Sequence, residues 1–490
     1  MTFVQTNEKS EEKIFARILD QSKFNDNFAS FKGDPRKLKN NPEYFYNTLL
    51  KTNHRALMIP ERFISNLENC PGAVVCSSPL FNKAIFTDEE NFPNIINPTE
   101  AIKAFTKAPA YHKLSSSFTL SHNKTEHRSI KKSFQKALNE NKIAVYAKDT
   151  MTCIDRFLQS LKIDQIINLN AEMKRLGTLL ANKIILGNEN DFSEEMDLVA
   201  LYQNILTTRI QIGSTTHHAE KNDLEKKLAD MSQLALIEFT KKISILRLNN
   251  SITAGVLGTL ASEKNESGDF ILSDAELINQ ASLLILGSHH PVSSTLTWAI
   301  FFLSTHPTIY KNIIEEIANV SDDYEKIEKL SLLDHIVKET LRIVPPNSLM
   351  LRYAKTDYEL FGTIIPQKTE VVLCPLITHR NKEIYSEPNV FLPNRWDSLK
   401  PEKFAYVPFG TGSRYCPGNY LAIMQIKLIL VRLLKRFQFQ LLDTHPINWT
   451  IKVNLIPEND IQFLLSDPKK NLTFKNNIKG NINKLISFVG

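Results

Sequence analysis

One cysteine of the sequence stands where its sulfur atom could act as a nucleophile or as a metal ligand. Cys416 lies near the end of the glycine-rich stretch FGTGSRYCPG, and an amphipathic helix is predicted directly after it, over residues 421–437. Because a helix N-terminus stabilises negative charge, the thiolate form is favoured here. Gly410 and Gly418 allow backbone conformations that bring amide groups close to the sulfur. Arg414 is suited to a carboxylate of whatever the sulfur binds.

The spacing of the other cysteines limits this chemistry. The chain has five cysteines and no C-x-x-C pair, so neither a disulfide framework nor a zinc site is indicated. One thiolate does not complete a tetrahedral metal site. It fits a metal whose other ligands belong to a cofactor, such as a haem iron with an axial thiolate. Phe409 would then shield the sulfur from water; a buried structural cysteine beside a tight turn is the alternative interpretation.

The stretch FGTGSRYCPG resembles the haem-binding signature of the cytochrome P450 family, F-x-x-G-x-R-x-C-x-G, at every fixed position. Two other segments follow the order of the family. KETLR resembles its E-x-x-R motif, with Glu339 and Arg342 on one helical face. FLPNRW resembles its P-x-R-W segment, where Arg395 would complete a structural, ion-paired triad. The resemblance covers about residues 30–467 and implies a mainly α (α+β) fold, with a large helical domain and a small β-rich region.

The same resemblance implies haem b as the cofactor, with Cys416 as the iron ligand. In TEHRSIKKSF, His127 and Lys131 take the places of two propionate-binding residues of the family, and SLMLRYA puts Arg352 at a third. Four cationic or donor groups around two buried carboxylates are what burial of a porphyrin dianion requires. The expected haem contacts are Cys416, Arg414, Arg352, His127, Lys131, Phe409, Gly410 and Gly418.

The segment LGSHHPVSSTLTW departs from the family pattern. The [AG]-G-x-[DE]-T motif of the family's oxygen-binding helix corresponds to residues 287–291, so His290 replaces the acid and Pro291 the threonine. Proline lacks the N–H that would bond the Gly287 carbonyl, which predicts a kink, and the hydroxyl that helps deliver protons is lost. His290 titrates near neutrality and is a candidate proton relay or carboxylate holder. A buried structural histidine is the alternative.

These substitutions leave several activities open. The expected function is oxygenation of an apolar organic substrate by dioxygen, with electrons from a separate protein. Family members that are fatty-acid peroxygenases carry Arg-Pro at these two positions, so a peroxide-driven peroxygenase is an alternative. Isomerases and dehydratases of the family, which rearrange peroxides, also dispense with the alcohol. A haem-based carrier that binds a ligand without turnover is the remaining alternative.

Charge and composition bear on partners and location. The net charge of +6 is too small to indicate nucleic-acid binding. No flavin or iron–sulfur module is recognised, so we expect an acidic ferredoxin, flavodoxin or reductase as the electron donor. Six basic residues could form its docking surface, unless they only solvate their helices: Lys131, Lys132, Lys136, Lys427, Lys435 and Arg436. With no signal-peptide or membrane-spanning pattern, we expect a soluble, cytoplasmic monomer.

The elements that must position these residues are mostly helical. Apolar periodicity predicts helices over residues 130–161, 223–246, 274–286 and 421–437. Hairpins are predicted over residues 362–376 and 449–465.

Substrate contacts are expected near residues 90–120 and 200–245. We divide the chain into a leader (1–29), a cytochrome P450 domain (30–467) and a basic tail (468–490), for which a frayed terminus is favoured over lipid contact.

Overall fold

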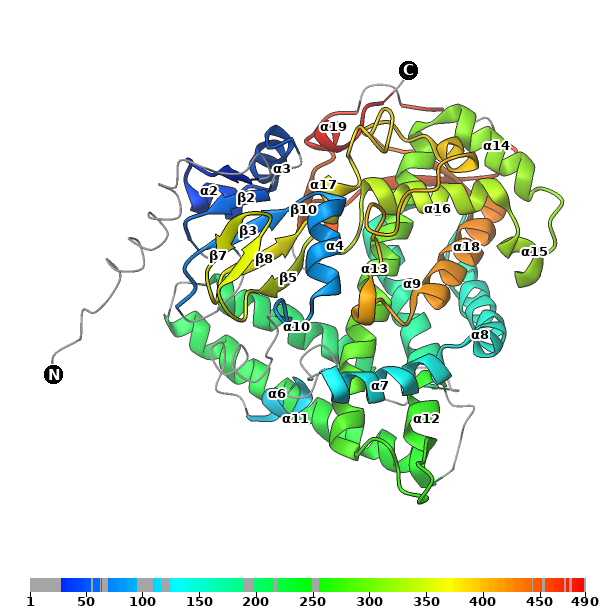
Figure 1. Ribbon diagram of the computed structural model, residues 1–490. Coiled ribbons are helices and arrows are strands. Elements are labelled where there is room, and N and C mark those ends of the chain that lie inside the picture. The colour runs from blue at the N-terminus through cyan, green and yellow to red at the C-terminus, as the bar shows by residue number, and fades with distance from the viewer. Residues whose placement is uncertain are drawn as a thin grey trace.

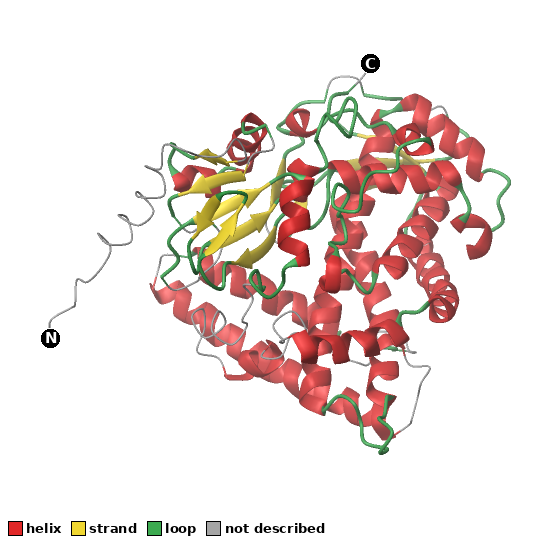
Figure 2. Ribbon diagram, viewed as in Figure 1, coloured by secondary structure: helices red, strands yellow, loops and turns green. Residues whose placement is uncertain are grey.

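The computed structural model describes residues 28–488 apart from 54–55, 62, 64–68, 95–108, 116–123, 189–196, 216–217, 249–254, 443, 452–453, 471–472 and 476–477. Helices make up most of it, and the strands β2, β3, β5, β7 and β8 lie together at one side (Figures 1 and 2). The mainly α fold with a small β region is therefore confirmed. The leader predicted over residues 1–29 lies almost entirely outside the described residues.

The strands form one mixed sheet and three small ones. The mixed sheet has the order β1-β2-β3-β8-β5, with β1 parallel to β2, β3 parallel to β8, and the other neighbours antiparallel. Its strands are β1 (Phe28–Ser30), β2 (Ala56–Ile59), β3 (Ala73–Cys76), β8 (Glu370–Leu373) and β5 (Met350–Tyr353). The small antiparallel sheets are β4 (Ile166–Asn168) with β12 (Gln462–Ser466) and β9 (Gln438–Leu441), β6 (Tyr358–Leu360) with β7 (Thr363–Ile365), and β10 (Trp449–Ile451) with β11 (Leu455–Pro457).

The helices surround a long central helix, α13 (Asp274–Thr305). Before it come α2 (Pro35–Asn40), α3 (Pro42–Lys51), α4 (Pro79–Thr87), α6 (Pro109–Ser115), α7 (Lys124–Ala137), α8 (Glu140–Gln159), α9 (Leu169–Leu180), the π-helical η1 (Ala181–Ile185), α10 (Leu198–Ser214), α11 (His218–Leu248) and α12 (Gly255–Ser262). After it come α14 (Pro307–Ile317), α15 (Tyr324–Glu328), α16 (Ser331–Ile343), α17 (Pro375–Thr378), the 3₁₀ turns η2 (Pro393–Asp397) and η3 (Gly412–Arg414), α18 (Asn419–Arg436) and α19 (Ile482–Leu485).

Capping residues explain where two of these helices begin. α13 starts with a capping box, in which Ser273 and Glu276 each accept a backbone N–H of the other. The helix predicted over residues 130–161 is divided in two, because Asn139 caps α8 by accepting the N–H of Lys142. This division separates α7, which reaches the site described below, from α8.

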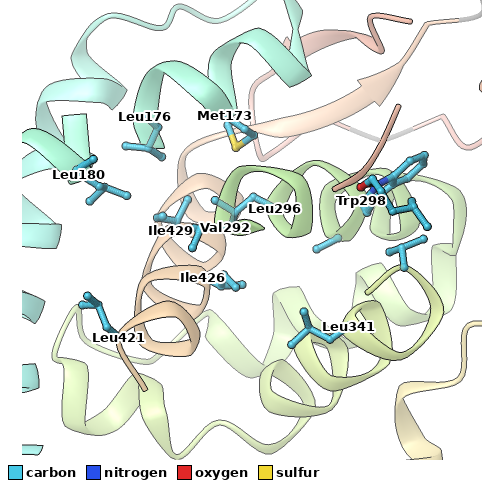
Figure 3. Close-up of a cluster of buried hydrophobic side chains, with 14 of the residues drawn as sticks. Met173, Leu176, Leu180, Val292, Leu296, Trp298, Leu341, Leu421, Ile426 and Ile429 are labelled. Atoms are coloured by element: carbon cyan, nitrogen blue, oxygen red, sulfur yellow. The ribbon is translucent and has the colours of Figure 1, made fainter. Parts of the chain in front are cut away.

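The core around α13 is apolar on several sides. α13 contacts α9, α11, α16 and α18. Figure 3 shows Val292 and Leu296 of α13 in one buried cluster with Met173 of α9, Ile426 of α18 and Leu341 of α16. Full burial of such a side chain contributes about 1.5–3 kcal/mol, so α13 is fixed in place by packing. No helix of the described residues combines the length and apolarity that crossing a bilayer requires.

The two predicted hairpins have different outcomes. Within residues 449–465, β10 pairs with β11 in register Ile451↔Leu455, as predicted, while β12 joins a different sheet. The hairpin over residues 362–376 is wrong. β7 pairs with β6, the strand that precedes it in the chain, and β8 lies in the mixed sheet between β3 and β5. The turn at Pro366 therefore connects two sheets.

The described part of the C-terminal segment is folded against the domain rather than frayed. Asn481 Oδ1 accepts the N–H of Trp449 at 2.7 Å, and its Nδ2 donates to the Trp449 carbonyl at 3.2 Å. The carbonyl of Leu485 accepts from the buried guanidinium of Arg380 at 3.0 Å. Ser487 N–H donates to the Asn389 carbonyl at 2.7 Å. Residues 478–488 therefore extend the folded part of the chain beyond residue 467.

Candidate functional site

The interior contains a cavity of about 800 Å³. It lies between α13 on one side and the Cys416 loop with the start of α18 on the other, and α7 and β5 close its rim. Most of its wall is leucine, phenylalanine, isoleucine, proline and valine. Every expected haem contact lines this one cavity: Cys416, Arg414, Arg352, His127, Lys131, Phe409, Gly410 and Gly418.

The loop that carries Cys416 is built by backbone turns. Gly410 and Gly412 have φ of 69° and 73°, a left-handed conformation that side chains disfavour. The Cys416 N–H donates to the Phe409 carbonyl at 3.0 Å, which closes the loop, and α18 begins at Asn419. The sulfur is therefore held just before the helix, as the sequence indicates.

The pKa of the Cys416 thiol is nevertheless raised. Burial disfavours the anion more than the Gly418 amide and the Lys131 charge favour it. We expected the helix N-terminus to stabilise the thiolate form of Cys416. The protein alone does not do so. A cation bonded to the sulfur would supply the missing stabilisation, and a coordinating thiol is deprotonated by its metal.

Four basic or donor side chains gather at the cavity from three elements: His127 and Lys131 of α7, Arg352 of β5 and Arg414 of η3. Arg352 is only 6% exposed, and it donates to the side chain of Asn94. Burial is the main reason that its pKa falls to about 10. Burial also lowers the pKa of Lys131 and of Arg414. Burial thus disfavours the charged form of each of these three side chains, and an anion bound beside them would compensate for it.

This arrangement fits the group that the sequence predicts. Among the described residues, no carboxylate forms an ion pair with Arg352, although it is buried. The charge of Glu89 offsets only part of the effect of this burial, and a buried cation without a close ionic partner is costly, so anionic groups in the cavity would stabilise Arg352. A cofactor with carboxylates at one edge, an apolar body and a metal that accepts one thiolate satisfies the cations, the apolar wall and Cys416 together.

The central helix meets the cavity along one face. Gly287, Pro291 and Thr295 line it at four-residue spacing, and α13 continues through Pro291 without a break in the helix. The helix is therefore not interrupted at Pro291, although proline lacks the N–H that would bond the Gly287 carbonyl. Thr295 Oγ1 donates to the Pro291 carbonyl at 2.8 Å, so its hydroxyl is engaged within the helix.

His290 is not brought to the cavity, which corrects the expectation that it relays protons there. It does not line the cavity, because successive residues are about 100° apart around a helix and Pro291 takes the cavity-facing place. Its ring lies 4.6 Å, edge-on, from that of His289. Burial first, and then the Lys174 charge, lower its pKa. A side chain that does not line the cavity is not placed to hold a substrate carboxylate there.

The neighbouring histidine has a structural position. His289 is buried, and its Nε2 lies 2.9 Å from the Lys174 carbonyl oxygen of α9. Burial is the largest reason that its pKa falls to about 4, with repulsion from His290 second. The two histidines that the sequence places beside Pro291 therefore belong to the α9–α13 contact.

The predicted ion-paired triad is present behind the cysteine loop. Arg342 reaches Glu339 with Nε and Nη2, each at 2.9 Å, and Arg395 Nε lies 3.0 Å from Glu339 Oε1. Burial raises the pKa of the Glu339 carboxyl, but the charges of Arg342 and Arg395 outweigh it, so that this pKa is lowered. The sequence analysis did not find Trp396, whose indole N–H donates to Glu339 Oε2 at 2.9 Å; its place in FLPNRW was the available signal.

The basic surface expected for a redox partner is smaller than predicted. Lys131 lines the cavity. Lys427 is buried and pairs with Asp334 at 2.7 Å. Lys136 and Lys435 pair with Glu263 and Asp322. Lys132 and Arg436 remain exposed.

The expected substrate-contact regions are met only in part. Asn94 of the 90–120 region lines the cavity, while residues 95–108 and 116–123 lie outside the described residues. No described residue of the 200–245 helices lines it. Further wall residues come instead from the connection after α16 and from the β10–β11 hairpin, whose contribution has no local sequence signal.

Comparison with known proteins agrees with this geometry. Residues 192–465 match the family described as Cytochrome P450. "Cytochrome P450 3A28" of Bos taurus is 39% identical over 179 residues, which are 34% of this chain and 35% of the relative. "Lanosterol 14-alpha demethylase" of Mus musculus is 34% identical over 234 residues, 46% of each. The matched part thus spans between a third and a half of these two relatives.

Solved structures resemble the whole fold. The chain is similar to the structure titled "Retinoic acid bound cyanobacterial CYP120A1", with a TM-score of 0.74 and 20% identity over 88% of this chain and 96% of that one. It is also similar to the haem domain of cytochrome P450DA, with a TM-score of 0.77 and 16% identity over 91% and 98%. The motifs, the cavity and the matched family lead to one conclusion: the chain belongs to the cytochrome P450 family, whose cofactor is haem b.

Proposed function

We propose that this chain is a haem-thiolate monooxygenase that oxygenates a neutral, largely apolar organic substrate. The reaction takes one dioxygen, two electrons and two protons: one oxygen atom enters the substrate, and the other leaves as water. The observation that carries the proposal is the convergence of Cys416 and four basic or donor side chains on one apolar-walled cavity. When bound, the haem iron with a thiolate ligand supplies oxygen binding and O–O cleavage.

The residues of the chain have separate roles in this proposal. Cys416 would ligate the iron, with the Gly418 amide directed at its sulfur and Phe409 excluding water. Arg352, Arg414, His127 and Lys131 would hold the propionates and so fix the cofactor's orientation. The apolar wall would hold the substrate and exclude bulk water from the reaction.

The substrate class rests on the wall chemistry and on two similar proteins. The basic groups of the cavity are assigned to the cofactor, so a charged substrate would lack a partner. One relative is named for lanosterol, which is uncharged, and one similar structure is titled for bound retinoic acid, which carries a carboxylate; the two molecules share a large apolar body. The electrons would come from a separate acidic redox protein, to which Lys132 and Arg436 offer positive charge.

A peroxide-driven reaction is the second candidate, and Pro291 favours it. Its ring occupies the cavity-facing place where the family's threonine would offer a hydroxyl. A route that begins from peroxide needs no electrons and fewer proton transfers, since the oxygen is already reduced. The substrate carboxylate would have to find a partner other than His290.

The decisive experiment is carbon monoxide difference spectroscopy of the reduced holoprotein, followed by turnover assays. We expect a red-shifted Soret band that Cys416→Ser abolishes and the control Cys70→Ser keeps. Retention of the band by Cys416→Ser would refute the assigned ligand. Purified protein with reductase, ferredoxin and NADPH should oxygenate members of a neutral lipid panel. Product with hydrogen peroxide alone would replace the first candidate by the second, and product under neither condition would leave the rearrangement and carrier interpretations.

A further inference from the structure

Two asparagine side chains meet at the wall of the cavity, far from each other in the sequence. Asn347 comes from the connection between α16 and β5, and Asn454 from the turn between β10 and β11. Asn454 Nδ2 lies 2.9 Å from Asn347 Oδ1. Both residues line the cavity, and Asn454 is nearly completely buried.

The two amides are held in place by the backbone beside them. The N–H of Leu455 donates to the Pro346 carbonyl at 3.0 Å, which ties the two segments together one residue away from the amide pair. The Leu455 carbonyl accepts from Ser294 Oγ at 2.6 Å, so α13 fixes the same turn. A polar pair anchored on both sides before a ligand arrives is pre-organised, which lowers the entropy lost on binding.

Hydrogen-bonding capacity remains at this pair. An asparagine amide offers two N–H donors and an oxygen with two lone pairs. Their mutual hydrogen bond leaves both N–H groups of Asn347 and the oxygen of Asn454 available, and no other hydrogen bond of either side chain occurs among the described residues. Exchanging oxygen and nitrogen in both amides leaves a donor and an acceptor available as well.

We infer that this amide pair binds a hydroxyl group of the substrate. The inference rests on the proposed function, because it takes the cations of the cavity as partners of the haem. A hydroxyl donates to one amide and accepts from the other, which no hydrocarbon can do. The pair is uncharged, so it would not compensate the desolvation of a carboxylate or an amine. The substrate is therefore a neutral alcohol with an apolar body, and Asn347 and Asn454 are its specificity-determining residues.

Matched ligands test the inference on the haem-loaded protein. Cyclododecanol and menthol are compared with cyclododecane and p-menthane, from which they differ by one hydroxyl. Binding is followed by the low-spin to high-spin change of the ferric Soret band and, independently, by the shift in thermal unfolding. We expect at least one alcohol to bind about tenfold more tightly than its hydrocarbon, the effect of one or two hydrogen bonds.

Variants then assign the preference to the pair. Asn347→Leu and Asn454→Leu keep the branching and the number of side-chain heavy atoms, and they should reduce the alcohol-to-hydrocarbon ratio to about one, with hydrocarbon affinity retained or improved. Asn312→Leu, on the exposed face of α14, is the matched control and should keep the wild-type ratio. Asn347 is itself exposed, so its variant should fold even where the buried Asn454 variant does not.

The failure of this inference is distinct from failure of the proposed function. A preparation that lacks the red-shifted carbon monoxide band refutes the haem-thiolate assignment. A preparation that shows the band, but binds neither alcohol better than its hydrocarbon, refutes the amide pair as a hydroxyl site. A preference that persists unchanged in Asn347→Leu refutes it equally.

Discussion

Glu339 and Arg342, three residues apart on α16, share two hydrogen bonds of 2.9 Å and have no solvent exposure. Arg342 also donates to the carbonyls of His379 and Pro388 at 2.9 and 2.8 Å. One carboxylate and one guanidinium thus connect α16 to the segment that precedes the cysteine loop. This connection makes the ion pair a structural centre rather than a part of the cavity.

Glu339→Gln should destabilise the protein strongly. It leaves the charges of Arg342 and Arg395 buried without an anion, a change that typically costs about 3–5 kcal/mol. Urea denaturation and haem content after purification measure the effect. The control is Glu315→Gln, which removes an exposed pair with Lys311 on α14 and should change stability by less than about 0.5 kcal/mol. Equal stability of the two variants would contradict this role.

Acid should destabilise the fold through His379. Its Nε2 accepts the N–H of Val407 at 2.9 Å, and burial, with repulsion from Arg342, lowers its pKa to about 3. The unfolded chain binds this proton near pH 6.5, whereas the folded chain does not until about pH 3. The free energy of unfolding therefore falls as the pH is lowered from 6.5, by up to about 1.4 kcal/mol per pH unit from this residue.

Denaturation at pH 7.5, 6.5 and 5.5 checks this dependence. His289, with a pKa of about 4, should contribute in the same direction. His379→Gln removes one of the buried histidines that titrate in this way and should flatten the loss of stability below pH 6.5. An unchanged slope in that variant would show that the acid sensitivity arises elsewhere.

Pro291→Thr should change how the haem-loaded protein obtains oxygen. The variant restores both a main-chain N–H for the Gly287 carbonyl and a hydroxyl at the cavity face, so the ratio of reductase-driven to peroxide-driven turnover should rise. Pro291→Ala restores only the N–H and separates the two effects. His290→Gln should leave the ratio unchanged, because this side chain does not line the cavity. If the ratio is unchanged in the Pro291 variants but changes in His290→Gln, then His290 rather than Pro291 controls how oxygen is obtained.

Gly177→Ala should destabilise the contact between α9 and α13. A Cβ atom at this position would lie 2.6 Å from Ser293 Oγ and 2.8 Å from His289 Cδ2, so the two helices would have to separate, at about 1–3 kcal/mol. Gly287→Ala is the matched control, since no heavy atom lies within 4 Å of its Cβ. Thermal unfolding should be lowered by the first substitution and nearly unaffected by the second.

The part of the site that lies within single motifs could be predicted from the sequence. The Cys416 loop is encoded over ten consecutive residues, and the triad by two short motifs, so local spacing was sufficient. The direction in which a side chain points from its helix could not be predicted in this way. His290 and Pro291 are neighbours in the chain, yet only Pro291 lines the cavity, because a helix turns by about 100° per residue.

Pairing between distant segments was the other source of error. Lysine is usually a surface residue, but Lys427 is buried, where it forms an ion pair with Asp334 of another helix. The turn at Pro366 has a hairpin's local pattern, but β7 pairs with β6, and β8 pairs with β3 and β5. The contact between Asn347 and Asn454 likewise depends on packing that no short motif records.

The docking of residues 478–488 has a consequence for synthesis on the ribosome. The Leu485 carbonyl that Arg380 requires and the Asn481 side chain that holds Trp449 are among the last described residues to emerge. While they are still inside the exit tunnel, the Trp449 hairpin and its neighbour Asn454 lack this support. In a nascent chain whose residues 478–488 have not yet emerged, this wall of the cavity is therefore less well supported than in the folded domain.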